Sequence, residues 1–301
     1  MKTRILSLGL LAASALVVLG AAACSGDAAG TVVPVGDGGA VPTNDASTVD
    51  AATAADDAAV VPSTGCTAPA PASGLSGKSV TVGGASRRYQ LFVPKGLDAK
   101  KPTRLVFVFH GLGGNGDQIR AYLGLEAQVG ADAVLVYPDG LVRLQGRTGW
   151  SEEDLPFFDA MVADVSGAVC VDQKRVFATG HSFGGYMTNL VGCLRGDVVR
   201  AIAPVSGGFV ASGACKGPVA AWLAHGDRDG TVPQSEGLAA RDRWLASNGC
   251  AATSKPVSPG QCVSYDGCTA NHPVVWCSFP GDHYPLPDYT RPAIWDFFKS
   301  M

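Results

Sequence analysis

The chain has 301 residues, of which 47% are hydrophobic and 16% are charged, and its formal net charge is -3. Six aspartates between residues 25 and 65 account for this acidity, and from Cys66 onward 21 basic residues stand against 20 acidic ones. A nearly neutral folded part has no electrostatic footprint for nucleic acid or for an anionic membrane surface, so we expect neither as a partner.

The N-terminus has the pattern of a secretory signal, because two basic residues precede an apolar run over residues 5–19 and small residues follow it. Cys24 comes directly after the small residues, an arrangement that resembles the bacterial lipobox, in which the thiol receives lipid. We predict a lipoprotein-type signal peptide over residues 1–24 and an extracytoplasmic protein whose only membrane contact is the lipid on Cys24. The alternative is an ordinary signal cleaved near Ala23, which would give a secreted protein.

Residues 25–65 consist mainly of Ala, Gly, Thr, Val, Pro and Asp and contain no Lys, Arg or aromatic residue. Such a segment cannot bury enough apolar surface to offset the entropy of ordering it. It is predicted to be a disordered tether. Residues 66–301 then form one α/β domain, which we expect to be monomeric.

Eight cysteines lie in this domain, and an even number in an exported chain indicates disulfides. The sequence has no Cys-x-x-Cys or Cys/His spacing of the kind that indicates a metal site. The pairing stays open at this point, although the crowding of four cysteines after residue 249 predicts a locally cross-linked C-terminal region.

Strand-like and helix-like segments alternate along the domain, which predicts a mostly parallel central sheet with helices on both faces and an antiparallel start. The predicted strands span residues 80–82, 88–93, 105–110, 133–137, 176–179, 201–205, 219–225 and 274–279. The predicted helices span residues 118–128, 155–168, 184–194, 236–247 and 293–299. Chemistry in such folds is usually at the carboxyl ends of the strands.

The segment GHSFG, residues 180–184, matches the pattern G-x-S-x-G between a predicted strand and a predicted helix. A sharp turn there requires residues without bulk around the serine and exposes its hydroxyl, as in a nucleophile elbow. We therefore interpret Ser182 as a nucleophile rather than as a turn residue.

A serine nucleophile needs a base, and the base in turn needs a group that orients it, in the chain order Ser, acid, His. Three histidines follow Ser182. His225 comes too early, and His272 precedes the last strand at the wrong end of the sheet. His283, just past that strand, is the predicted general base.

The acid is expected after the preceding strand, in the segment HGDRDGTVP. This segment resembles the HGxxDxxVP pattern that carries the acid in many esterases, which points to Asp229. Asp227 is the alternative, with a turn cap as its other role. Asp282 is interpreted as a loop residue, because sequence neighbours rarely present their side chains to one another.

Acyl transfer also requires hydrogen-bond donors for the oxyanion. The amide of Phe183, directly after the nucleophile, is one candidate, and Leu112 in FHGLGGNG is the other. This glycine-rich loop is not a phosphate cradle, because it lacks the GK[ST] ending of a P-loop and the Rossmann pattern.

From about residue 88 to the end, the motifs VFHGLGGNG, GHSFGGYM, HGDRDGTVP and GDHYPLP follow one another in the order seen in a known family. The chain resembles the α/β-hydrolase esterases grouped as polyhydroxybutyrate depolymerases and feruloyl esterases. The resemblance implies an α/β-hydrolase catalytic domain over residues 66–301 and an exported serine carboxylic ester hydrolase that needs no cofactor. It assigns the triad to Ser182, Asp229 and His283, with the two amides above as oxyanion donors.

The substrate expected from this resemblance is a hydroxyalkanoate such as hydroxybutyrate, or a feruloyl or acetyl ester of a polysaccharide. Trp150 is a candidate for the substrate pocket, with core packing as the alternative. Two other functions remain open. The first is a non-catalytic surface lipoprotein that keeps the fold for binding, and the second is a serine peptidase of the same fold.

Overall fold

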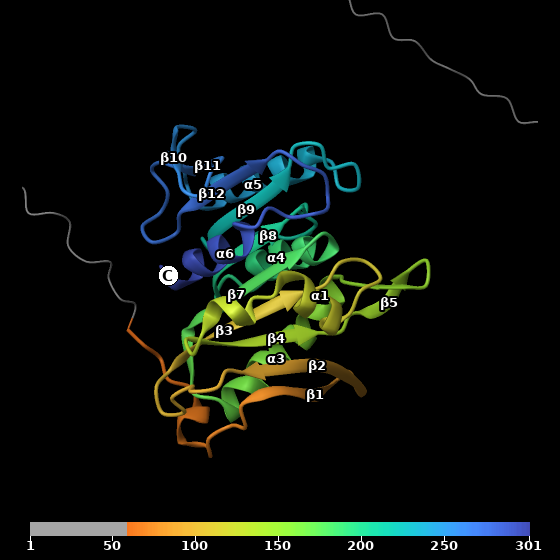
Figure 1. Cartoon of the computed structure of the whole chain (residues 1–301), viewed down its shortest axis with the longest axis vertical. Helices are drawn as coiled ribbons and strands as arrows, with labels where there is room; N and C mark the ends of the chain where they lie inside the picture. Colours follow the sequence, from red (N-terminus) through yellow and green to blue (C-terminus); the bar gives the residue numbers. More distant parts are fainter. Residues whose placement is uncertain (1–58) are drawn as a thin grey trace, which may run out of the picture. The chain divides into compact units, whose positions relative to one another are not determined.

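The structure, a computed structural model, describes residues 59–301 (Figure 1). The predicted signal peptide, Cys24 and most of the predicted tether lie outside these residues. Within them no helix is long and apolar enough to cross a membrane.

A ten-stranded sheet runs through the described part in the order β1-β2-β4-β3-β7-β8-β9-β12-β11-β10 (Figure 1). Its strands are β1 (Gly74–Val82), β2 (Ala85–Val93), β3 (Thr103–Phe109), β4 (Ala133–Pro138), β7 (Val171–His181), β8 (Val199–Val205), β9 (Ala220–Gly226), β10 (Ser254–Val257), β11 (Cys262–Tyr265) and β12 (Val274–Phe279). The six strands from β4 to β12 in this order are parallel, and both ends of the sheet are antiparallel. The predicted α/β architecture, including its antiparallel start, is confirmed.

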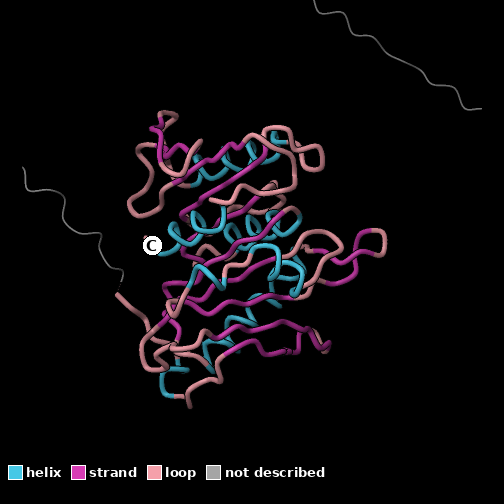
Figure 2. Tube along the Cα trace, in the orientation of Figure 1, coloured by secondary structure: helices cyan, strands magenta, loops and turns pink. Residues whose placement is uncertain are grey.

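The central strands are apolar on both faces because helices cover both faces (Figure 2). In β3, Phe107 and Phe109 join a core cluster that contains side chains of α3 (Leu155–Ala168), α4 (Phe183–Leu194) and α5 (Gln234–Ser247). Val106 and Val108 alternate with them and join a second cluster with α1 (Gly116–Leu123), α2 (Glu126–Val129) and α6 (Thr290–Lys299). The two-residue period of the strand thus divides one apolar run between two cores.

The helix predicted over residues 118–128 is two helices in the structure, because α1 ends at Leu123 and α2 begins at Glu126. Gly124 caps α1 in the left-handed conformation, with φ of 55°. A glycine adopts this conformation at little cost and commonly ends a helix in this way.

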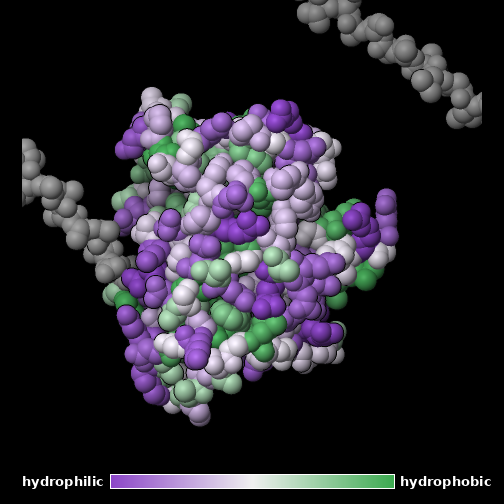
Figure 3. All heavy atoms as spheres, in the orientation of Figure 1, coloured by the Kyte–Doolittle hydropathy of each residue, from purple (hydrophilic) through white to green (hydrophobic). Residues whose placement is uncertain are grey.

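The sequence did not predict the short strands β10 and β11 or the hairpin of β5 (Leu141–Leu144) and β6 (Arg147–Gly149). This hairpin projects from the body of the molecule, as Figures 1 and 3 show. Its first strand, β5, exposes three aliphatic side chains, whereas Trp150, directly after β6, is buried. The exposed side chains are those of Leu141, Val142 and Leu144.

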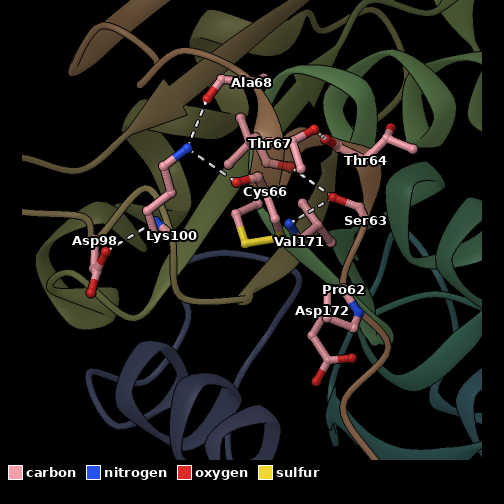
Figure 4. The surroundings of a disulfide bond; sticks show 12 residues. Pro62, Ser63, Thr64, Cys66, Thr67, Ala68, Asp98, Lys100, Val171 and Asp172 are labelled. Atoms are coloured by element: carbon pink, nitrogen blue, oxygen red, sulfur yellow. Dashed lines mark hydrogen bonds between the residues drawn. A yellow bond between two sulfur atoms is a disulfide. The ribbon is translucent and has the colours of Figure 1, made fainter.

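Residues 62 and 63, just before the predicted domain start at Cys66, already pack against the domain (Figure 4). Pro62 forms a β-bridge with Asp172. The Ser63 hydroxyl donates to the Val169 carbonyl at 2.9 Å and accepts from the Val171 amide at 3.0 Å. The composition of this segment gave no sign of these contacts, since they are made by backbone groups and one small side chain.

All eight cysteines of the domain are paired. One disulfide ties the N-terminal segment to the start of β7, one joins the end of α4 to the loop after β8, and two lie after residue 249, which confirms the expected local cross-linking. The pairs are Cys66–Cys170, Cys193–Cys215, Cys250–Cys268 and Cys262–Cys277.

Replacing Ser63 with Ala is expected to lower the free energy of unfolding by about 1–3 kcal/mol, because a buried carbonyl and a buried amide lose their partner. Urea unfolding with the disulfides intact measures this change. The matched control is Ser79→Ala on the exposed face of β1, which should change stability by less than about 0.5 kcal/mol. Equal effects of the two substitutions would contradict the packing of the N-terminal segment.

Candidate active site

Ser182 stands at the turn between β7 and α4, with φ of 59° and ψ of -124°. Non-glycine residues rarely adopt such a conformation, and it marks strain of the kind found at functional sites. The elbow packs tightly against β3, since a Cβ on Gly184 would overlap the carbonyl of Phe109. The glycines of GHSFG are therefore required by the close approach of two backbones, and the turn at Ser182 is sharp, as the G-x-S-x-G pattern predicts.

Both predicted oxyanion donors lie beside this serine. Phe183 is the first residue of α4, so its amide has no acceptor within the helix, and the helix dipole favours negative charge there. The loop after β3 passes directly against the nucleophile, because a Cβ on Gly111 would lie 3.7 Å from Ser182 Oγ. Leu112, the next residue, lines the adjoining cavity.

His283 and Asp229 are in direct contact, with His283 Nδ1 donating to Asp229 Oδ2 at 2.6 Å. The other carboxylate oxygen accepts from the amides of Thr231 and Val232 at 2.9 and 2.8 Å. Burial opposes ionisation of Asp229, yet these hydrogen bonds from His283 and the two amides hold its pKa below the usual range. The carboxylate is therefore ionised at neutral pH, and the stability it contributes above its unfolded pKa is lost as the pH falls through the lowered folded pKa.

The second ring nitrogen of His283, Nε2, is buried and has no hydrogen-bond partner among the described residues. Because Nδ1 carries the proton given to Asp229, Nε2 holds the lone pair that a general base needs. Ser182 directly follows His181, whose ring centroid lies 4.5 Å from that of His283. The imidazole of His283 therefore packs against the residue that directly precedes Ser182.

His181 also supports the loop that carries His283, since its Nε2 donates to the His283 carbonyl at 3.1 Å. Burial, with a smaller contribution from His283, lowers the pKa of His181 to about 3. His181 is thus neutral at physiological pH, and it does not add a positive charge beside the base.

Asp227 and Asp282 connect the loop after β9, which carries Asp229, to the loop after β12, which carries His283. Asp282 Oδ1 accepts from the Gly230 amide at 2.9 Å and from the His283 amide at 2.6 Å. Asp227 Oδ1 accepts from the Gly281 amide at 2.9 Å. Asp227 and Asp282 therefore each join the loop after β9 to the loop after β12, which sequence reasoning did not foresee.

His225 ends β9 beneath the acid. Its Nε2 donates to the Val232 carbonyl at 2.9 Å and lies 3.4 Å from Asp229 Oδ2. Burial lowers the pKa of His225, so it is a neutral packing residue next to the carboxylate. His272 contacts the Ala270 carbonyl in its own loop. Neither histidine takes the place of His283 beside the elbow.

A cavity of about 430 Å³ adjoins the elbow, lined by residues of the loop after β3, by α1, by His181 and by Tyr284. Tyr122 and Tyr284 line it as an edge-to-face pair, with ring centroids 5.4 Å apart. Trp150, predicted as a pocket residue, is 5% exposed and is not part of this lining. Its indole packs on Phe109, and Nε1 donates to the His110 carbonyl at 2.8 Å.

Of the two roles left open for Trp150, its burial fits core packing and not the pocket, and its support for the loop after β3 was missed. A single aromatic residue after a strand is typical both of a pocket residue and of a core residue, so the sequence does not separate the two roles. His110 and His181 were also missed, although each stands inside a motif that was examined for other residues. Within residues 59–301 no group of three or more His, Cys, Asp or Glu side chains is placed to hold a metal ion.

Two curated proteins resemble this chain over most of their length. Feruloyl esterase D of Neurospora crassa is 35% identical over 275 residues, which are 81% of this chain and 92% of that protein. Feruloyl esterase C of Emericella nidulans is 35% identical over 234 residues, 71% of this chain and 84% of that protein. No protein-family model matches the chain.

Solved structures share the fold. The acetyl xylan esterase from Aspergillus awamori has a TM-score of 0.55 at 13% identity, with 74% of this chain and 99% of that chain covered. A mutant feruloyl esterase module from Clostridium thermocellum, complexed with sinapinate, has a TM-score of 0.55 at 15% identity, with 80% and 92% covered.

The fold and these similarities define a serine carboxylic ester hydrolase of the α/β-hydrolase class. More narrowly, at 35% identity over nearly the whole described domain, the chain belongs to the feruloyl esterase family. The resemblance to feruloyl esterases that the sequence motifs indicated is confirmed. The alternative of a non-catalytic surface lipoprotein is not supported.

Replacing Asp282 with Ala is expected to lower kcat about 10- to 100-fold, because the loop that carries His283 loses one of its links to the loop that carries Asp229, the link nearest His283, and the imidazole shifts. Hydrolysis of a 4-nitrophenyl ester measures the loss. Asp282→Asn retains the accepting oxygen and should keep most of the activity. If both variants were as active as the wild type, the link would have no part in placing His283.

Proposed function

We propose that the chain hydrolyses feruloyl and related aromatic esters of polysaccharides through a triad of Ser182, His283 and Asp229. The observation that carries the proposal is the 2.6 Å contact between His283 and Asp229 at the edge of the sheet where Ser182 sits in a strained elbow. The relatives named feruloyl esterases support the choice of ester.

In the proposed mechanism, Ser182 Oγ attacks the ester carbonyl carbon while its proton passes to His283 Nε2. Asp229 stabilises the resulting imidazolium through the Nδ1–H bond. The amides of Leu112 and Phe183 donate to the oxyanion of the tetrahedral intermediate. His283 then gives its proton to the departing alcohol, which leaves the acyl group on Ser182 Oγ.

Deacylation repeats these roles with water as the nucleophile. His283 Nε2 takes a proton from water as its oxygen attacks the acyl carbon, and the same proton returns to Ser182 Oγ when the carboxylic acid leaves. No step of this sequence draws on a cofactor.

The cavity supports an aromatic acyl group. Tyr122 and Tyr284 present ring surfaces beside His181, whose ring centroid lies 4.8 Å from that of Tyr284. Aromatic rings prefer offset or edge-to-face neighbours at such separations, so a planar cinnamoyl group has suitable partners there. The cavity volume of about 430 Å³ is in the range of small-molecule sites.

The four disulfides of the described domain support an extracytoplasmic location, because such bonds persist in oxidising compartments. Attachment through a lipid on Cys24 and the monomeric state both stay predictions.

Asp229→Asn is expected to lower kcat by about 10⁴, because the amide favours the wrong tautomer of His283 and cannot stabilise its positive charge. The matched control is Asp227→Asn, two residues away, which should cost far less. Burst kinetics with a 4-nitrophenyl ester measure both variants, and Ser182→Ala should abolish the burst. If Asp227→Asn were the damaging change, the assignment of the acid would be wrong.

The substrate is tested by giving the wild type and Ser182→Ala methyl ferulate, hydroxybutyrate oligomers and the corresponding feruloyl amide in parallel. We expect serine-dependent release of ferulate from the ester, because its planar acyl group can pack against the rings of the two tyrosines that line the cavity. Release of hydroxybutyrate alone would replace the proposed substrate with a hydroxyalkanoate. Cleavage of the amide at a comparable rate would favour a peptidase.

A further inference from the structure

The glycine-rich loop after β3, residues 110–114, does not hold its shape by its own hydrogen bonds alone. We call it the oxyanion loop, because it carries Leu112. Within it, the Gly114 amide donates to the Gly111 carbonyl at 3.0 Å. The ring of His110 adds a second hydrogen bond inside the loop, to the Gly111 carbonyl. The other hydrogen bonds to the loop come from the segment over residues 140–150, which contains the β5–β6 hairpin.

Thr148 holds the loop at two points. Its carbonyl accepts from the Gly113 amide at 2.7 Å, and its hydroxyl Oγ1 donates to the Gly114 carbonyl at 2.6 Å. These two bonds lie on the residues directly after Leu112, so they determine the direction in which the chain leaves it. Arg147 adds a bond from its guanidinium to the Leu112 carbonyl at 3.2 Å.

The beginning of the loop is held from the same segment. Trp150 Nε1 donates to the His110 carbonyl, and the Gly140 amide donates to His110 Nε2 at 2.9 Å. His110 Nδ1 in turn donates to the Gly111 carbonyl at 2.7 Å. Burial lowers the pKa of His110, which keeps the neutral ring that this pattern of one donor and one acceptor requires.

The base of the hairpin also packs closely beside the loop. A Cβ on Gly149 would meet the ring of Phe183 at 2.6 Å and the side chain of Leu112 at 3.5 Å. The hairpin base therefore touches both residues whose amides are the expected oxyanion donors. Sequence places Leu112 and Thr148 36 positions apart, and only the fold brings them together.

We propose that Thr148 and Trp150 are positioning residues that set the oxyanion loop against Ser182. This inference rests on the proposed function, because it assigns the loop a role in stabilising the oxyanion. Such donors act on the transition state and little on the bound substrate, so a displaced loop lowers kcat and leaves KM nearly unchanged.

The main test compares Thr148→Val, which removes the hydroxyl at nearly constant shape, with Thr148→Ser, which retains it. Thr81→Val on the exposed part of β1 is the matched control, and Trp150→Phe removes the second donor. All variants are made in the full chain, and melting temperatures identify any that fail to fold. The measurements are kcat and KM for methyl ferulate and the inhibition constant of a trifluoromethyl ketone, which forms a tetrahedral adduct with a serine.

For Thr148→Val we expect a fall in kcat of about 10- to 100-fold with KM within about 3-fold of the wild type. The affinity for the ketone should fall in parallel with kcat/KM. Thr148→Ser and Thr81→Val should stay within about 3-fold in both. A merely structural role would lower the melting temperature and leave the ketone affinity unchanged, which would overturn the inference.

Amide hydrogen exchange of the peptide that contains residues 110–114 gives a readout without turnover. Exchange should accelerate in Thr148→Val and not in Thr148→Ser, and equal exchange would overturn the inference. If the wild type reacted with neither the ketone nor a fluorophosphonate, the proposed function would fail, whereas the exchange comparison would still decide whether Thr148 holds the loop.

Discussion

Asp229 is 7% exposed, and a buried carboxylate is tolerated in ionised form only where donors surround it. Its donors come from its own loop after β9 and from His283 after β12. These loops meet because β9 and β12 are parallel neighbours, with Gly226 opposite Phe279 in the register. The order of strands at this end of the sheet therefore brings the donors of Asp229 together. The hydrogen bond from the Gly230 amide to Asp282, which joins the two loops, depends on the same order.

The position of the nucleophile follows from a second constraint, the close approach of β3 and the turn between β7 and α4. Backbone oxygens of β3 occupy the space where a Cβ of Gly184 would be. This crowding brings the loop after β3 against Ser182. Ser182, Asp229 and His283 thus follow β7, β9 and β12, three strands that are separate in the chain and end at one edge of the sheet.

Several elements and most of the site could be predicted from the sequence because their signals are local or ordered. The parallel strands are continuous apolar runs, the elbow is a pentapeptide between a strand and a helix, and His283 follows from its place after the last strand. The roles of Asp282, His181 and Trp150 could not be predicted, since each depends on a partner from another loop. The same holds for Ser63, whose two hydrogen bonds order a segment that its composition describes as unstructured.

The sequence by itself determined the class of fold and the presence of cross-links after residue 249, and it named the serine, the histidine and the favoured acid of the proposed site. These properties depend on periodicity, on small residues at fixed spacing and on chain order, all of which are written along one dimension. Tertiary structure alone decided which cysteines pair, which carboxylate touches His283, and that Trp150 supports the oxyanion loop instead of lining the cavity. The physical reason is that hydrogen bonds and disulfides form between groups a few ångströms apart, and only the folded chain sets that separation for residues far apart in sequence.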